Sequence, residues 1–463
     1  MSQGGKLHNP AEGALAGLSA LAAAVMAASA ALYVLLDSPA HGALLVFAGL
    51  ALAAGLCVLA RLASRADARA LGCAVFFAAL ALRLAALAAL PMEPESDFLL
   101  LYDAACRFAA GDKAAFAGEY FALWGYQIPF ALYEALVVRL GGGAAALGAL
   151  NTLWGALIAA LVFGLARRFA GEGPAAAAGL MYACWPAALL LTPVLTNQFV
   201  SLAFILMGVF LASAGGLKRS ALGGAALALG NLMRPEAALA LLGLAAALVV
   251  RLAGRRGEWK RALSDFAALL AGYIALTALF TAAARASGIA PNGLGNAAPE
   301  WKFVLGLDTA TRGEYDAGME YILEIADPAA RRAAALEAIR ASLEGAGGPG
   351  GLIAFFAEKT AAFWGAYEES WLGLESGAAY FLRRCDRAFF IAAALLAVLG
   401  CARLRASAEE NAARGALLAC FAAYLVIETQ SRYRCFAAPL LLILAAAGIK
   451  RLLSYGQGRR KRV

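Results

Sequence analysis

The chain has 463 residues, of which 63% are hydrophobic and 15% are charged. Soluble domains are nearer half apolar and a quarter charged, so these values exclude an ordinary water-soluble fold. The net charge of +8 does not indicate nucleic-acid binding, because the Lys and Arg residues occur in short clusters between apolar runs. Eight scattered cysteines and two histidines argue against a disulfide framework or a His/Cys metal site.

Apolar segments recur along the chain at lengths suited to membrane helices. A spanning helix needs about 20 apolar residues, and the sequence predicts an all-α polytopic membrane protein with about twelve of them. The first segment lacks an evident small-residue cleavage site, so we interpret it as a retained helix rather than a signal peptide. The predicted spans are 14–36, 43–60, 72–90, 146–166, 175–192, 194–214, 221–233, 237–252, 266–284, 388–404, 415–427 and 436–453.

The basic clusters set the predicted orientation. With twelve spans, each cluster and both termini fall on one side of the membrane, which is the cytoplasm by the positive-inside rule. Segment 128–140 decides this count because it is apolar but only about thirteen residues long, with Glu134 and Arg139 inside it. If it crossed, Arg167, Arg168 and most later clusters would move outside. We therefore expect it to lie on the outer surface or to dip into it.

Four regions follow from this topology. Residues 1–70 hold two N-terminal spans, and 71–285 form a transmembrane core with a first outer loop at 91–145. Residues 286–387 form an extracytoplasmic helical loop domain, and 388–463 hold the last spans and a basic cytoplasmic tail.

Two helices are predicted within the outer domain. Asp327 followed by Pro328 is typical of a helix start, and this helix should end near Gly345. A second helix over 352–371 carries aromatic residues that we expect to pack against the membrane face. They are Phe355, Phe356, Phe363, Trp364 and Trp371.

Asp97 follows the third span and precedes an amphipathic segment, so its carboxylate is expected at the membrane interface. Partial desolvation there would suit it to remove a proton from an acceptor. The alternative is that Asp97 is the N-cap of the surface helix, and both roles can coexist. Arg83, inside the third span, is expected to snorkel outward, with a position facing the bundle interior as the alternative.

Arginines return at other predicted outer ends. Arg234 lies between two short spans and needs a partner, because an unpaired charge is costly there. Glu236 or Glu428 would make it a structural ion pair, whereas a lipid phosphate would make it functional. Segment 428–434 places two arginines around a tyrosine, which indicates either an interfacial anchor or a site for an anionic lipid head group.

The order of these pieces resembles the GT-C membrane glycosyltransferases, which include the protein O-mannosyltransferases and the aminoarabinose transferase acting on lipid A. Glu95-Ser-Asp97-Phe, followed by Tyr102-Asp-Ala-Ala, is similar to the first outer loop of that superfamily, where an acidic residue is catalytic. The resemblance continues through 119–134, 195–198, 232–236, 306–315 and 432–439. It covers most of the chain from the third span onward, and the first two spans look like an N-terminal addition.

The resemblance implies an inverting transfer of a sugar from a polyprenyl-phosphate donor to a glycan, lipid or protein acceptor at the extracytoplasmic face of the cell membrane. Asp97 would be the general base. Arg234, Arg432 and Arg434 would steady the leaving phosphate, with Tyr102 and Tyr433 as hydrogen-bond donors. The residues expected to line or support the acceptor side are Glu119, Trp124, Tyr126, Gln127, Asn197, Gln198, Glu236 and Arg312.

Two departures from the pattern bear on this expectation. Many relatives carry an Asp-Glu pair at the catalytic position, but here Phe98 follows Asp97, so a second acid would have to be Glu95, Asp103 or Glu119. Some relatives use a divalent metal; without a cluster of carboxylates and histidines in the sequence, a metal-independent reaction with no cofactor is expected.

Two alternatives come from other functional classes. A transporter or flippase for a lipid or polysaccharide would also be polytopic and basic on the inside. It should place polar groups near the midplane and show paired repeats of broken helices, and neither is evident in the sequence. A non-catalytic scaffold for envelope assembly is the third reading, and it would leave Asp97 as a helix cap.

Overall fold

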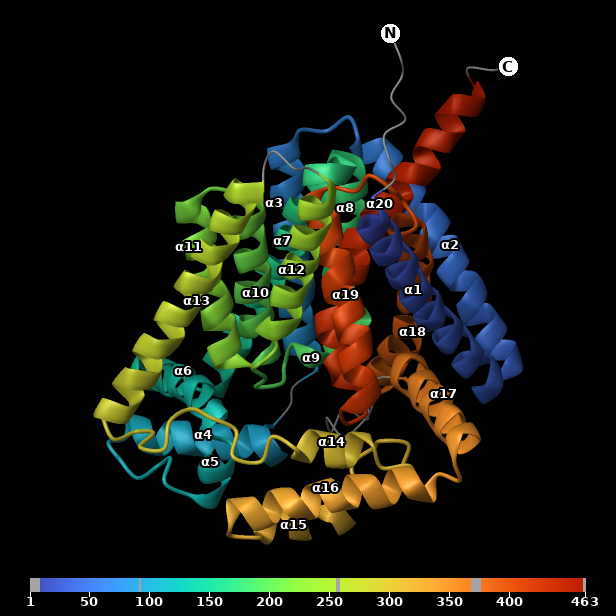
Figure 1. Cartoon of the computed structure of the whole chain (residues 1–463). Helices are drawn as coiled ribbons and strands as arrows, with labels where there is room; N and C mark the ends of the chain where they lie inside the picture. The colour runs from blue at the N-terminus through green and yellow to red at the C-terminus, as the bar shows by residue number, and fades with distance from the viewer. Residues whose placement is uncertain (1–8, 91–92, 255–258, 368–375, 461–463) are drawn as a thin grey trace.

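A computed structural model describes residues 9–90, 93–254, 259–367 and 376–460. Helices make up almost all of the regular structure (Figure 1). In these ranges the only β-type pairing is an isolated bridge between Trp124 and Asn296. The predicted all-α class is confirmed.

Seven of the described helices are long and apolar enough to cross a membrane, which supports an integral membrane protein. They are α1 (Pro10–Asp37), α2 (Pro39–Ala63), α3 (Ala68–Ala89), α7 (Ala144–Ala170), α12 (Ala237–Gly254), α13 (Trp259–Ala286) and α20 (Arg434–Arg460). The remaining predicted spans are occupied by less apolar or shorter helices, so the number twelve stays a prediction. These are α8 (Glu172–Ala183), α9 (Pro186–Leu191), α10 (Gln198–Ser213), α11 (Leu217–Met233), α18 (Gly377–Cys401) and α19 (Ala408–Val426).

Small residues let the bundle helices approach closely. Gly400 of α18 faces α20, where an added Cβ would lie 2.0 Å from the carbonyl oxygen of Leu444. Gly448 of α20 faces back, and a Cβ there would lie 2.0 Å from the carbonyl oxygen of Leu396. In a membrane the hydrophobic effect does not drive helices together, so van der Waals contact at this close approach holds them in the bundle.

The two ends of the bundle differ (Figure 1). α1 begins and α20 ends at the same end, where the short links α2–α3, α7–α8, α10–α11 and α18–α19 also lie. The opposite end carries α4 (Ser96–Ala109), α5 (Glu119–Leu123) and α6 (Ile128–Arg139). α6 has 12 residues, about 18 Å of helix, and packs beside α4 instead of running through the bundle. Which end faces the cytoplasm stays a prediction.

The second outer segment forms a further helical layer at the end that carries α4. It contains α14 (Trp301–Gly306), α15 (Tyr321–Glu324), α16 (Pro328–Gly345) and α17 (Pro349–Gly365), with short 3-10 turns at Ala317–Met319 and, elsewhere, at Gly125–Gln127 and Ser431–Tyr433. Asp327 caps α16 and accepts a hydrogen bond from the backbone N–H of Ala330 at 2.7 Å, which confirms the predicted start of this helix. The helix ends at Gly345, as predicted.

The second predicted outer helix is shorter than expected, because α17 ends at Gly365. Two of its aromatic residues, Phe363 and Trp364, pack on the bundle. The ring of Phe363 lies 4.7 Å from that of Tyr424, and the ring of Trp364 stacks 6.0 Å from that of Phe421, both on α19. The predicted Trp371 lies outside the described residues.

The two outer segments are joined to each other. The backbone N–H of Ala297 donates to the carbonyl of Leu123 at 2.9 Å. Leu123 and Trp124 of the first outer loop pack on a small core that includes Trp301 and Leu305 of the second. The first loop and the later segment therefore form one wall across this end of the bundle.

The fifth predicted span is a broken helix. α8 ends at Ala183 and α9 begins at Pro186. Arg83 is fully buried and donates to the carbonyls of Tyr182 at 3.4 Å and Ala183 at 3.2 Å, while Asp386 of α18 accepts from the backbone N–H of Ala187 at 3.2 Å. Both helix ends at the break thus receive a compensating charge. The expectation that Arg83 snorkels outward was wrong, and the alternative, a position facing the bundle interior, is what the structure has.

Candidate active site

A cavity of about 690 Å³ lies between the outer segments and the end of the bundle. Its walls come from the first turn of α4, segment 120–127, the start of α14, segment 314–323 and the link from α19 to α20. The lining residues are Ser96, Asp97, Phe98, Tyr120, Trp124, Tyr126, Gln127, Trp301, Lys302, Leu305, Glu314, Tyr315, Glu320, Leu323, Glu428, Thr429, Gln430 and Arg432.

Asp97 lies in the first turn of α4 and is exposed in the cavity wall. The N-cap of this helix is Glu95, so the alternative interpretation of Asp97 as the cap was wrong. The preceding Ser96 has φ +52, a left-handed conformation that is strained for a residue with a side chain and often occurs at functional sites.

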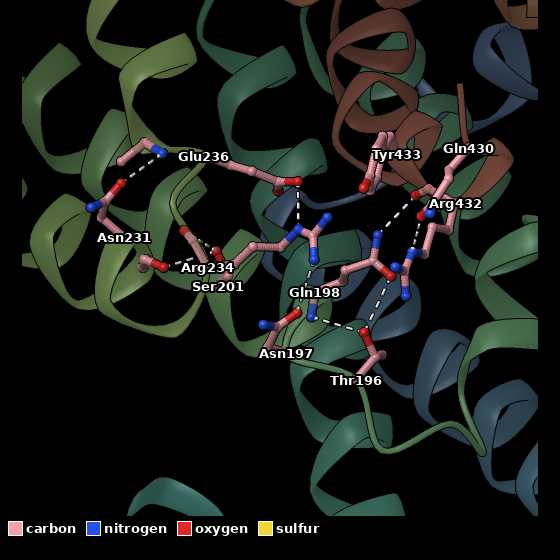
Figure 2. A network of polar contacts seen from close by, with 12 residues as sticks. Thr196, Asn197, Gln198, Ser201, Asn231, Arg234, Glu236, Gln430, Arg432 and Tyr433 are labelled. Atoms are coloured by element: carbon pink, nitrogen blue, oxygen red, sulfur yellow. Dashed lines mark hydrogen bonds and ion pairs between the residues drawn. The ribbon is translucent and has the colours of Figure 1, made fainter. Parts of the chain in front are cut away.

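Two cations, Lys302 and Arg432, line the same cavity as Asp97. The Nε of Arg432 donates to Gln430 at 2.7 Å, and its carbonyl accepts from Gln198 at 2.8 Å (Figure 2). Lys302 forms an ion pair with Glu428. Burial would lower the pKa of Lys302, but the neighbouring Tyr433 and Glu428 raise it above its ordinary value, so Lys302 stays charged.

Arg234 lies outside the lining of this cavity. Its Nε donates to Glu236 at 2.6 Å and its Nη1 to Asn197 at 3.3 Å (Figure 2). Of the two carboxylates predicted as partners, Glu236 is therefore the one that pairs with it. All three cations lie near the ring of Tyr433. The guanidinium carbons of Arg234 and Arg432 and the Nζ of Lys302 lie 5.3, 5.7 and 5.9 Å from the ring centre.

Three of the predicted acceptor-side residues, Trp124, Tyr126 and Gln127, line the cavity together with Tyr120. Burial raises the pKa of Tyr120, and the negative charge of Asp97 raises it further. Burial also raises the pKa of Tyr126, although the nearby cations oppose this change. Both phenols therefore remain hydrogen-bond donors at neutral pH.

Asn197 and Gln198, at the start of α10, support the site from the side of the bundle. Asn197 is buried and donates to Gln127 at 3.4 Å, which links the first outer loop to Arg234. Gln198 is buried and holds the backbone of Arg432. Neither lines the cavity, so we expect them to hold the residues that do, Gln127 and Arg432, in place.

Besides Arg234, Asn197, Gln198, Glu236 and Tyr433, four further predicted site residues do not line the cavity. Arg434 is buried and donates to the carbonyls of Phe363 at 3.2 Å and Ala366 at 2.6 Å, at the end of α17. The hydroxyl of Tyr102 accepts from the backbone N–H of Ala144 at 3.1 Å. The other two, Glu119 and Arg312, are exposed outside the cavity lining.

Sequence reasoning missed Lys302 as a site residue. It stands in no recognisable motif, and the only signal is that the outer segment 286–387 contains just two lysines. Across the described ranges, no group of three His, Cys, Asp or Glu side chains could hold a metal ion. No protein-family model matches the chain, and no curated protein matches it significantly.

Proposed function

We propose that the protein is an inverting glycosyltransferase of the GT-C type, which moves a sugar from a polyprenyl-phosphate donor to an envelope acceptor at the extracytoplasmic face. The observation that carries this proposal is that one cavity is lined by the carboxylate of Asp97 and by the cations of Arg432 and Lys302. Inverting sugar transfer needs a base for the acceptor hydroxyl and positive charge for the leaving phosphate.

A lipid-linked donor is supported by a second feature of Arg432. This residue also lines a narrow crevice inside the bundle, between α9, α18 and α20, whose lining includes the apolar Trp185, Leu191 and Phe390 and the charged Asp386, Arg387 and Arg434. Arg432 therefore stands between the polar cavity and a crevice whose walls are partly apolar and partly charged. A lipid phosphate has the same two parts, a charged head and an apolar tail, and arginine suits the phosphate oxygens.

In this reaction Asp97 takes the proton of the acceptor hydroxyl as its oxygen bonds to the anomeric carbon. The bond from that carbon to the donor phosphate oxygen breaks, and its electron pair leaves with the phosphate. Arg432 and Lys302 compensate the negative charge that develops on the leaving group. Tyr120, Tyr126 and Gln127 supply polar groups on the acceptor side.

The test is Asp97→Asn, assayed in membranes with a panel of polyprenyl-phosphate hexoses and pentoses. We expect transfer to fall by about 10²–10⁴-fold, the usual contribution of a general base, while polyprenyl-phosphate binding stays within about twofold. The matched control is Asp112→Asn, because Asp112 pairs with Arg107 on the exposed surface of the same outer loop. Transfer that survives in Asp97→Asn would remove the base from the mechanism.

The broken helix favours a second candidate, a lipid or polysaccharide transporter. Discontinuous helices with charged groups at their ends are common at transport sites, and α8 and α9 meet beside the buried Arg83 and Asp386. This candidate predicts lipid movement across liposome membranes without an acceptor, and no effect of Asp97→Asn on that movement. A wild-type protein with neither activity would favour the envelope scaffold.

A further inference from the structure

Glu428 is a buried carboxylate at the centre of the wall that carries the cations. Its side chain is 1% exposed and pairs with Lys302. It also accepts hydrogen bonds from the amide of Gln430 at 2.6 Å and from the hydroxyl of Tyr433 at 3.2 Å. Its backbone N–H donates to the carbonyl of Lys302 at 3.0 Å. One residue thus ties the start of α14 to the link between α19 and α20.

Gln430 extends this contact to Arg432. Its Nε2 donates to Glu428, and its Oε1 accepts from the Nε of Arg432 at 2.7 Å (Figure 2). An amide has one donating and one accepting end, so the bond to the carboxylate turns the accepting oxygen toward the guanidinium. Gln198 holds the backbone of Arg432 from the other side at 2.8 Å.

The charges of Lys302, Arg432 and Glu428 explain why a buried carboxylate is tolerated here and how much positive charge the three residues offer a ligand. A buried carboxylate is costly unless it is paired and hydrogen-bonded, and Lys302 supplies the pair. Lys302, Arg432 and Glu428 together carry one net positive charge, on a cavity lining that also includes the carboxylates of Asp97, Glu314 and Glu320. A phosphodiester, the linkage between a lipid phosphate and a sugar, carries one negative charge.

We infer that Glu428 is a positioning residue for an anionic, lipid-linked phosphate, acting on Lys302 directly and on Arg432 through Gln430. This inference rests on the proposed function. Glu428 holds both cations in the orientation that faces the cavity, so the phosphate meets them without first ordering them. Preorganised groups of this kind bind more tightly than mobile ones, because their ordering cost is met in folding.

The experiment measures binding of polyprenyl phosphate to the purified full-length protein in detergent, with the melting temperature recorded for each variant. Glu428→Gln keeps the shape of the side chain and removes its charge, and we expect the Kd to rise about tenfold or more. Glu428→Asp should recover part of that affinity. The control is Glu344→Gln, which breaks an exposed ion pair with Arg340 on α16 and should leave the Kd unchanged.

Gln430→Met is the second variant, because it cuts the connection to Arg432 and leaves the Lys302–Glu428 pair in place. We expect a rise in Kd of about threefold to tenfold with little change in melting temperature. If Glu428→Gln does not fold, the Kd of Gln430→Met tests the positioning role by itself.

Two outcomes are distinguishable. If the wild-type protein does not bind polyprenyl phosphate, the proposed function and this inference both fall. If the wild type binds and Arg432→Gln weakens binding, but Glu428→Gln and Gln430→Met leave the Kd unchanged, the positioning role alone falls. A purely structural Glu428 would lower the melting temperature and leave the Kd of the folded fraction as in the wild type.

Discussion

Cations serve the two halves of this molecule differently. Inside the bundle, Arg83 and Arg434 donate to backbone carbonyls at helix ends, at the break after α8 and at the end of α17. At the cavity, Lys302 and Arg432 are held by side chains, a carboxylate and an amide, and both face open space.

The difference teaches how to separate structural from binding arginines in a membrane protein. A carbonyl at a helix end has no water to satisfy it in lipid, so an arginine bonded there completes the backbone. A cation fixed by other side chains at a cavity wall still presents charge to a ligand. Residues of the first kind should affect folding when replaced, and residues of the second kind should affect binding.

The largest expected effect is that of Arg83→Leu. This change leaves the carbonyls of Tyr182 and Ala183 without their donor inside the bundle. Each unsatisfied buried group costs about 1–3 kcal/mol, so we expect a loss of about 2–6 kcal/mol of stability. Yield of folded protein and melting temperature measure it, with Arg107→Leu at an exposed ion pair as the control. Normal stability combined with lost polyprenyl-phosphate binding would break the comparison.

Arg432 and Arg434 offer an internal comparison one residue to either side of Tyr433. We expect Arg434→Gln to lower stability by about 2–3 kcal/mol, since it removes charged hydrogen bonds to the carbonyls of Ser431, Phe363 and Ala366, and to leave the Kd for polyprenyl phosphate unchanged. Arg432→Gln should raise that Kd by about 10–100-fold, as expected for a lost charged contact, with a small change in melting temperature. The reverse pattern in the two variants would show that their roles are assigned the wrong way round.

The smallest expected effect is a dependence of stability on pH. The Lys359 amine is buried, where it donates to the carbonyls of Gly306 and, at 2.7 Å, Ile427, and burial lowers its pKa from 10.5 to about 8. Between these two values the unfolded chain binds more protons than the folded one, so stability should rise with pH, by at most about 1.4 kcal/mol per unit.

Melting temperatures of the wild type and of Lys359→Met between about pH 7.5 and pH 10 measure this dependence. The variant has no titrating group at this position, so its stability should rise less over the same range. Equal slopes in the two proteins would show that Lys359 does not titrate in this window.

Much of the architecture could be predicted from local patterns. Asp327 and Pro328 predict the start of α16 correctly, because capping depends on residues within one helical turn. Segment 128–140 is too short to span, and α6 lies beside α4 at the end of the bundle. The break in the fifth span was missed, because Ala175 to Leu191 reads as one apolar run and Pro186 alone does not show which residues cap the two ends.

The sequence by itself determined that this is a helical membrane protein and drew attention to Asp97 and Arg432, because hydropathy and charge placement act over short stretches of chain. Only the tertiary structure decided which cations share a cavity with Asp97. Arg432 reaches it and Arg434 does not, although both flank Tyr433, and Lys302 joins from another segment. The reason is physical: a buried charge takes the partner that folding brings to it, and Glu428 lies 126 residues from Lys302 in the chain.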